Sequence, residues 1–315
     1  MSATLSRPRS LPAATARVRH SLPERLAPYA YIAPFFLIFA VFGLVPLLFT
    51  FYVALFDWNP IGEHVFVGAG NFNRLLADTR FWNAAWNTIS IWLLSTVPQL
   101  VLALGLAHLL NHARLRLAVW WRMSMLVPYI TSVAATTIVF AQMFDRDYGL
   151  LNWLLGLVGA GPIDFLQSGW TSHLMIAVMV TWRWFGYTTL LYLASLQAVP
   201  RTVYEAAAVD GAGAWKQFRH ISIPSLRPVI VFTIVTSTIG GLQVFTEPLL
   251  VTTTSPLTCG AVRQCQTLTL FLYEQGFGRF QFGYGAAIGV ALFVLIIAIA
   301  SLNYVLSTRI RPERG

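Results

Sequence analysis

Six long runs of apolar residues, separated by shorter polar segments, dominate the chain. They cover approximately Tyr29–Phe56, Thr88–Leu110, Met123–Phe144, Ser172–Leu196, Val229–Val251 and Tyr284–Leu306. An α-helix needs about 20 mostly apolar residues to cross the hydrocarbon core of a bilayer, and each run meets that length. The runs lack the alternation of polar and apolar residues that is typical of a membrane β-strand. The pattern therefore predicts an all-α membrane protein with six transmembrane helices.

Composition and charge agree with this prediction and set the orientation. Of 315 residues, 57% are hydrophobic and only 10% are charged, against roughly a quarter charged in soluble domains. The net charge is +9. The arginines and the one lysine gather in the N-terminal tail, the second-to-third loop, the fourth-to-fifth segment and the C-terminal tail. Basic residues in short loops stay on the cytoplasmic side, so we expect both termini to be cytoplasmic and no nucleic-acid partner.

The domain organisation follows from these runs. We predict a disordered basic cytoplasmic tail at residues 1–27, one six-helix membrane domain at residues 28–308 with a polar loop at 198–225, and a second cytoplasmic tail at residues 309–315. Cys259 and Cys265 share one predicted outer loop, and that compartment permits disulfides. They are either a disulfide or two free thiols. With no histidine nearby, we expect no metal site.

The segment EAAAVDGAGAWKQFRHISIP, between the fourth and fifth runs, is a polar hairpin in an apolar chain. Glu205 and the alanines 206–208 are strong helix formers, and Gly211 suits a helix end that needs a left-handed residue. A second helix follows through Trp215, and Pro224 is expected to stop it before the next run. The bare alanine surface predicts either a docking site for another protein or a loop helix that lies on the membrane.

The spacing EAA--DGA--------I-IP, from Glu205 to Pro224, resembles the cytoplasmic signature loop of membrane permeases in bacterial ABC importers. The flanking sequence LYLASLQAVPRTVYEAAAVDGAGAWKQFRHISIPSLRP resembles the carbohydrate-uptake branch, the maltose or sugar type. Three further segments resemble this family: VGAGNFNRLLADTRFWNAAWNT, GLLNWLLG and FGRFQFGYGAAIG. The resemblance therefore extends from about Ala30 to Leu306. It implies the type I ABC importer permease fold and a multi-pass protein of the bacterial inner membrane, which forms half of a translocation pore with a second permease subunit.

The resemblance also implies how such a pore is driven. The 205–224 loop would seat in a cytoplasmic ATPase dimer, and an extracytoplasmic sugar-binding protein would deliver the solute. The coupling residues it implies are Glu205, Ala206, Ala207, Asp210, Gly211 and Trp215. ATP and Mg would bind the partner ATPase, so we expect neither enzyme activity nor a cofactor in this chain. A phosphate-binding loop needs G-x-x-x-x-G-K-[ST], and the only lysine, Lys216, lies in no such motif.

In the maltose-importer relative, the fourth and fifth spans hold the sugar. By position, the candidate substrate contacts here are Tyr187, Gln243, Trp184, Thr238, Phe245 and Arg183; ordinary helix packing is the alternative for each. An arginine near the middle of a spanning helix costs about 2.5–3.5 kcal/mol, so we expect Arg183 to pair with Glu247, to lie near an interface or to face a water-filled path. Arg183 keeps open an importer of a phosphorylated polyol such as glycerol phosphate. An ion-coupled secondary transporter is a further alternative, although internal repeats and a buried acidic relay are absent from the sequence.

Overall fold

The computed structural model describes residues 22–60, 62–112 and 118–309. Most of the two predicted tails therefore lies outside the described residues, as do the arginines of residues 113–117; helix α1 begins at Leu22, before the predicted domain boundary. The chain divides into two compact units, residues 1–49 and 50–315, which are considered one at a time.

The first unit contains a long apolar helix. In it, α1 (Leu22–Phe39) continues through a π-helical turn, η1 (Ala40–Leu44), into the start of α2 (Val45–Val53). Its large apolar side chains are exposed, among them Tyr31 at 86% and Phe42 at 77%. Apolar surface of this extent needs a covering of lipid or of another membrane helix. The first predicted span is therefore an apolar helix of the kind that membrane proteins contain.

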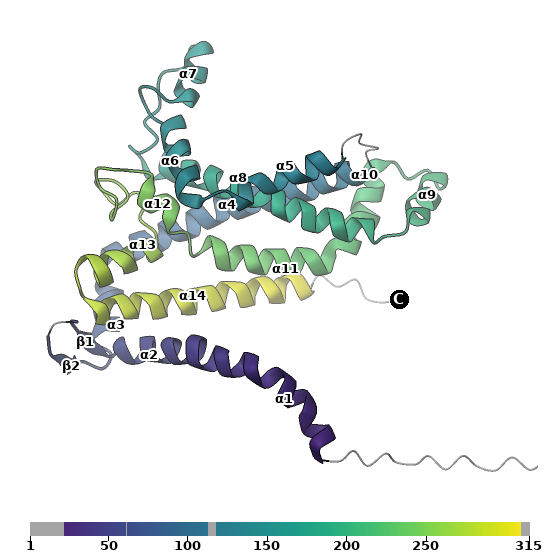
Figure 1. The fold of residues 1–315 in the computed structure, drawn as a ribbon. Coiled ribbons are helices and arrows are strands. Elements are labelled where there is room, and N and C mark those ends of the chain that lie inside the picture. Colours follow the sequence, from purple (N-terminus) through teal and green to yellow (C-terminus); the bar gives the residue numbers. More distant parts are fainter. Residues whose placement is uncertain (1–21, 61, 113–117, 310–315) are drawn as a thin grey trace, which may run out of the picture. The chain divides into compact units, whose positions relative to one another are not determined.

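The second unit is a helical bundle with one short hairpin (Figure 1). After the hairpin β1 (Phe56–Trp58) and β2 (His64–Phe66) come α3 (Gly70–Ala77), α4 (Thr79–His112), α5 (Ala118–Ile130), α6 (Val133–Met143), α7 (Leu150–Leu157) and α8 (Gly169–Gln197). Then follow α9 (Arg201–Val209), α10 (Ala214–Gln217), the π-helical turn η2 (Phe218–Ser222), α11 (Ile223–Gly241), α12 (Thr246–Leu250), α13 (Leu268–Tyr273), the π-helical turn η3 (Glu274–Gly278) and α14 (Phe282–Arg309).

The predicted spans correspond to helices of the structure. Within the described residues, five helices are long and apolar enough to cross a membrane, and a sixth span results if one bent pair is counted as a unit. They are Tyr29–Val53, Thr79–Asn111, Gly169–Gln197, Ala214–Leu250 and Phe282–Leu306, with the pair Val119–Ile130 and Val133–Met143. The fold class is thus the predicted helical membrane architecture, with the short β1–β2 hairpin as an addition that the sequence pattern did not predict.

The third predicted span is bent. Its two halves, α5 and α6, meet at 92°. Ser132, between them, has an extended backbone with ψ of 128°, which interrupts the helical hydrogen bonds. A continuous helix over Met123–Phe144 is therefore wrong, because hydropathy reports the apolar length of a run and gives no sign of the two non-helical residues, Thr131 and Ser132, within it.

The predicted stop at Pro224 is also wrong. The second helix of the hairpin does not end before the fifth run, because α10, η2 and α11 follow one another without a break and belong to one span, Ala214–Leu250. The π-helical turn Phe218–Ser222 lies directly before Pro224. A π turn accommodates an inserted residue inside a helix, and Pro224 lies in the first turn of α11, where its missing N–H is tolerated.

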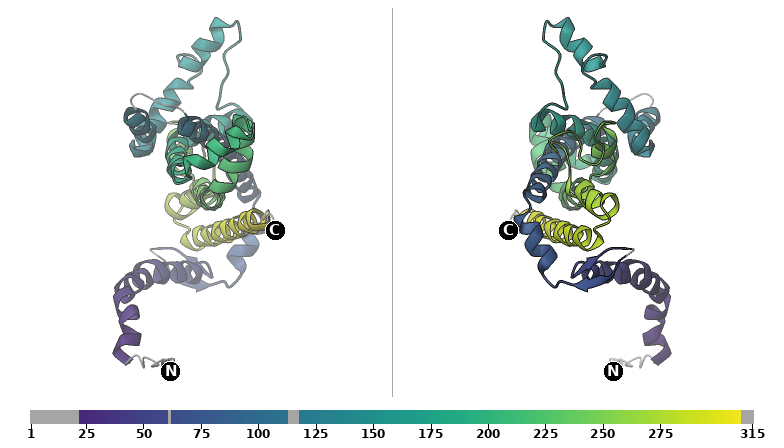
Figure 2. Two further views of the ribbon diagram at one scale, coloured as in Figure 1. Left: turned by 90° about the vertical axis from the view of Figure 1, so that its right-hand side faces the viewer. Right: turned by 90° about the vertical axis from the view of Figure 1, so that its left-hand side faces the viewer.

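Four helices form the body of the bundle. α4 packs against α8, and α11 contacts α4, α8 and α14. Near the α9–α10 end, Ala103 and Ala107 of α4 pack against Tyr192 and Leu196 of α8, because small residues let membrane helices approach closely. In the views of Figure 2, α6 and α7 project away from this body. The body positions two features: an exposed hairpin at one end and a cavity between the helices.

Candidate functional site

The exposed hairpin is built by α9 and α10. Pro200 lies directly before α9, and Gly211 ends that helix with φ of +77°. The N–H of Ala212 donates to the carbonyl of Ala207 at 2.8 Å, and that of Gly211 donates to Ala208 at 3.1 Å. This pair of bonds is a Schellman motif, which needs a left-handed residue at its turn. The predicted helix end at Gly211 is confirmed.

The hairpin exposes small, acidic and aromatic side chains to its surroundings. Glu205, Ala206 and Asp210 are exposed and Ala207 is half-buried. Trp215 is 70% exposed, and its ring lies 5.5 Å from that of Phe218. The six predicted coupling residues therefore lie together on one hairpin, and its surface is the kind that a protein partner covers.

A cavity of about 140 Å³, lined by aromatic, apolar and hydroxyl-bearing side chains, lies between α4, α5, α8 and α11. Its wall consists of Thr96, Gln99, Tyr129, Val180, Trp184, Tyr187, Thr188, Phe232, Thr233, Thr236, Ser237, Gly240 and Gly241. Hydroxyl and amide groups beside flat aromatic rings suit a neutral, hydroxyl-rich solute, because rings stack on apolar ring faces while polar groups exchange hydrogen bonds.

Two sets of contacts shape this cavity. The rings of Tyr129 and Tyr187 are stacked, with centroids 4.7 Å apart and planes at 14°, and Trp184 meets Tyr129 edge-on at 5.3 Å. Gln99 is buried and its Nε2 donates to Oγ1 of Thr188 at 2.9 Å and to Oγ of Ser237 at 3.2 Å. One amide thus joins α4, α8 and α11 at the cavity wall.

The predicted substrate contacts do not all reach this cavity. Tyr187 and Trp184 line it. Thr238 does not, because it is buried and accepts a hydrogen bond from Nδ2 of Asn303 at 3.0 Å. Gln243 is exposed outside the lining, and the ring of Phe245 packs 5.2 Å from that of Tyr273.

Arg183 is half-buried and also lies outside the cavity lining. It attracts the buried carboxylate of Glu247 electrostatically, and within the described residues the two form no salt bridge of 4.0 Å or less. The expected partnership with Glu247 is therefore a longer-range interaction between helices.

Sequence reasoning missed several residues of the cavity wall. Gln99, Tyr129, Thr236 and Ser237 line it and none was a candidate. For Gln99 a signal existed, since an amide within an apolar spanning run needs partners inside the protein. For the hydroxyl residues no signal existed, because serine and threonine also satisfy their own helix backbone.

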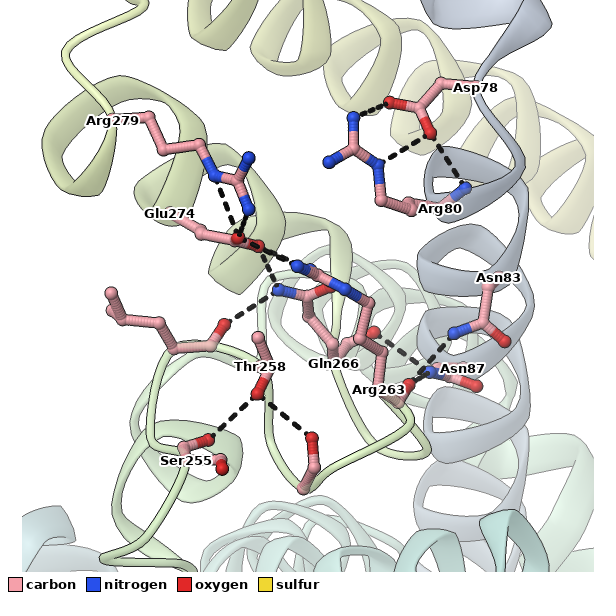
Figure 3. Close-up of polar contacts among 12 residues, drawn as sticks. Asp78, Arg80, Asn83, Asn87, Ser255, Thr258, Arg263, Gln266, Glu274 and Arg279 are labelled. Carbon is pink, nitrogen blue, oxygen red and sulfur yellow. Dashed lines mark hydrogen bonds and ion pairs between the residues drawn. The ribbon is translucent and has the colours of Figure 1, made fainter.

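At the other end of the bundle, a disulfide joins Cys259 to Cys265. Between them, the carbonyl of Arg263 accepts hydrogen bonds at 2.9 Å from the amides of Asn83 and Asn87 on α4 (Figure 3). The disulfide loop is thereby held on α4.

A buried carboxylate holds the same loop (Figure 3). The side chain of Glu274 is 5% exposed; its oxygens lie 2.5 Å and 2.9 Å from the guanidinium of Arg263 and 2.8 Å from that of Arg279. Gln266 donates to it at 2.8 Å. Burial alone would raise the pKa of Glu274, but these donors favour the charged form more strongly and hold the pKa at about 2.

A second carboxylate nearby behaves in the same way. Burial would raise the pKa of Asp78, but hydrogen bonds from Arg80 and from the hydroxyl of Tyr284, at 2.7 Å and 2.8 Å, lower it to about 2. Charge-assisted hydrogen bonds of this length are among the stronger ones in proteins. This end of the bundle is therefore fixed by ion pairs, and the sequence did not predict them.

Comparisons with known proteins show which family this chain resembles. A family model described as "Binding-protein-dependent transport system inner membrane component" matches residues 75–312. The arabinooligosaccharides transport system permease protein AraP of Bacillus subtilis (strain 168) is 34% identical over 292 residues, which are 92% of this chain and 91% of the relative. The lactose transport system permease protein LacF of Rhizobium radiobacter is 35% identical over 280 residues, 88% of this chain and 92% of the relative.

A solved structure shares the fold. A chain of a bacterial ABC transporter involved in the import of the acidic polysaccharide alginate superposes with a TM-score of 0.76 at 20% identity, covering 92% of this chain and 98% of that one. The fold is that of a type I ABC importer permease. The chain belongs to the family of inner membrane components of binding-protein-dependent transport systems.

Proposed function

We propose that this chain is the permease subunit of an ATP-driven importer of a di- or oligosaccharide. The observation that carries the proposal is the continuity of one helix: α10, η2 and α11 lead from the exposed hairpin directly into the cavity wall at Thr236 and Ser237. A movement imposed on the hairpin would therefore move one side of the cavity.

The hairpin is proposed to dock a separate ATPase on the cytoplasmic side. In this arrangement Glu205 meets basic groups of the ATPase, the small side chains of Ala206 and Ala207 permit close seating, and Gly211 makes the bend. ATP and Mg would act in that partner. Both chain termini would then be cytoplasmic, which the basic residues near them support.

The cavity supports the proposal of a second permease and of a saccharide substrate. Its volume of about 140 Å³ is smaller than the roughly 300–1,000 Å³ of ordinary ligand pockets, so a partner permease would complete it. The relatives are named for arabinooligosaccharide and lactose transport, and stacked tyrosines beside an amide and hydroxyls suit such solutes. An extracytoplasmic binding protein would deliver them. The absence of Arg183 from the cavity lining favours a neutral sugar over a phosphorylated polyol.

Substitution at the hairpin tests the docking role. Ala207→Trp places a bulky ring where the ATPase would seat, and Ala160→Trp is the matched control, since Ala160 is exposed in the loop after α7. We expect both variants to insert in the membrane, and only Ala207→Trp to lose the ATPase on purification of the complex and to lose uptake. An Ala207→Trp complex that keeps its ATPase and transports normally would refute the docking role.

Substitution in the cavity tests the substrate. A panel of radiolabelled disaccharides and oligosaccharides, with glycerol phosphate as the charged competitor, identifies the transported solute in vesicles. Tyr187→Ala should then lower the apparent affinity for that solute by about 10-fold or more, because stacking of an aromatic ring contributes roughly 1–3 kcal/mol, whereas Tyr187→Phe should retain most of it. If Tyr187→Ala, like Tyr187→Phe, kept the wild-type apparent affinity for the solute, Tyr187 would be excluded from the solute path.

A further inference from the structure

Three polar side chains from three elements meet at the end of the bundle that carries the hairpin. Ser222, in the π-helical turn η2, is fully buried. Its hydroxyl oxygen lies 3.1 Å from Nδ1 of His108 on α4 and 3.3 Å from the hydroxyl of Tyr204 on α9. A serine hydroxyl donates one hydrogen bond and accepts up to two, so it can bind both partners at once. We call these three residues the Ser222 node.

The surroundings of the node keep its members in place. The ring of His108 packs against that of Phe218, with centroids 4.7 Å apart. Nε2 of Gln217, a buried side chain, donates to the carbonyl of Ala212 at 3.0 Å and thereby closes the hairpin behind the node. Polar networks that are satisfied and buried hold a single geometry better than apolar contacts do.

The node joins helices that the chain connects only at a distance. Covalently, the hairpin continues into α11 through α10 and η2, whereas α4 lies more than 80 residues earlier along the sequence. The node therefore links α9 to α4 through the hydroxyl of Ser222 on η2. Further from the hairpin, within the cavity wall, Gln99 of α4 donates to Ser237 of α11. α4 and α11 are thus tied at two levels, one at the hairpin and one at the cavity.

We propose that the Ser222 node is a positioning element that makes α4 follow the hairpin, so that both walls of the cavity, Gln99 on α4 and Ser237 on α11, move together during transport. This inference rests on the proposed docking of an ATPase on the hairpin. Rigid elements transmit a movement as a unit when discrete contacts join them. Without the node, α11 follows the hairpin through its covalent connection, whereas α4 is joined to α11 only by helix packing and by the bond from Gln99 to Ser237, so the part of α4 nearest the hairpin lags behind.

Variants at His108 separate the hydrogen bond from the packing. His108→Phe keeps an aromatic ring against Phe218 and removes the nitrogen that contacts Ser222. His108→Asn loses the ring and restores a polar atom near the position of Nδ1. Tyr204→Phe removes only the hydroxyl on the α9 side and serves as the second variant. None of these residues lines the cavity, so binding of solute there should be unaffected.

A cysteine in the cavity wall reports the movement. The natural cysteines, two in the whole chain, are joined in the disulfide, so Thr236→Cys, at an exposed position of the cavity wall, supplies the only thiol of this chain. The complex that co-purifies with the full chain is labelled with a membrane-impermeant maleimide, with and without trapping by MgATP and vanadate. The first readout is the ratio of the labelling rate with trapping to the labelling rate without it. The second is the amount of solute taken up per ATP hydrolysed, measured for the same variant.

In the wild-type background, trapping should change the labelling rate. We expect His108→Phe and Tyr204→Phe to keep the ATPase bound but to reduce transport per ATP roughly three- to ten-fold, the effect of losing one hydrogen bond from the coupled state, while trapping still changes labelling of α11. His108→Asn should restore coupling toward wild type. Wild-type coupling in both phenylalanine variants, or no recovery in His108→Asn, would overturn the node's role. Failure of the wild-type chain to retain any ATPase would instead overturn the proposed function itself.

Discussion

Glu274→Gln is the substitution that most directly tests the ion-pair cluster at the disulfide end of the bundle. Glutamine preserves the size of the side chain and one acceptor oxygen, but it removes the negative charge that faces Arg263 and Arg279. The guanidinium of Arg263 is only 19% exposed, so the substitution leaves a largely buried cation without its counter-charge. Removal of one partner from a buried pair is strongly destabilising.

The magnitude follows from the pKa. The ordinary value for glutamate is 4.5, and that of Glu274 in the folded protein is about 2. Since one pKa unit corresponds to about 1.36 kcal/mol, the charged form contributes about 3 kcal/mol to folding. Because the folded-state pKa is the lower one, this stability is fully present above pH 4.5 and is lost as the pH falls toward 2.

Thermal unfolding of the purified protein in detergent measures the effect. The intrinsic fluorescence of the 11 tryptophans is the signal. At neutral pH we expect Glu274→Gln to lower the melting temperature by roughly 5 °C or more, given about 2 °C or more per kcal/mol for a domain of this size. The control is Glu63→Gln, the same change at an exposed residue, for which we expect no shift.

The pH dependence of the two melting temperatures provides the result that could refute this reasoning. As the pH falls below 4.5, the wild-type protein loses the contribution of Glu274, so its melting temperature should approach that of Glu274→Gln. The other low-pKa carboxylate, Asp78, is present in both proteins and cancels in the comparison. A melting temperature unchanged by Glu274→Gln at neutral pH, or a difference that stays constant down to pH 3, would show that the cluster does not stabilise the fold.

Three further variants test the helix packing, the disulfide and the hairpin turn, each by the same melting measurement. Gly186→Ala should cost about 1–3 kcal/mol, the usual range for overpacking, because its new Cβ would overlap the carbonyl of Met125 on α5; an unchanged melting temperature would mean that α5 and α8 separate freely. Joint replacement of Cys259 and Cys265 by serine should cost roughly 2 kcal/mol for a loop of this length, and a reductant should then destabilise only the wild type. Gly211→Ala should cost about 1–2 kcal/mol because φ there is +77°; equal stability would show that the turn rearranges.

Sequence alone determined the features that depend on local chemistry. Apolar runs of spanning length fixed the number and approximate positions of the membrane helices, since only a helix satisfies its backbone in lipid. Glycine at residue 211 predicted the helix end, because only glycine adopts that backbone at no steric cost. The spacing of the signature loop indicated the family.

Tertiary structure decided what depends on which face of each helix meets which neighbour. Thr236 and Ser237 line the cavity while Thr238, one residue further, bonds to Asn303 on α14. A spanning helix is apolar all round, so its sequence carries little signal for its buried face. The bend between α5 and α6 and the passage of the helix through Pro224 likewise depend on single residues whose effect is set by their surroundings.

The partners of the charged residues are a further feature that the sequence did not predict. Glu274 is paired with Arg279 five residues further along the chain, but it meets Arg263 only because the disulfide loop lies against η3. The Ser222 node exists only because α4, α9 and η2 converge. Contacts between residues far apart in sequence arise from packing of whole helices, and a charged or polar residue in a one-dimensional pattern can have many partners. The sequence therefore predicted a membrane permease with a docking hairpin, and the three-dimensional arrangement chose the partners that hold it together.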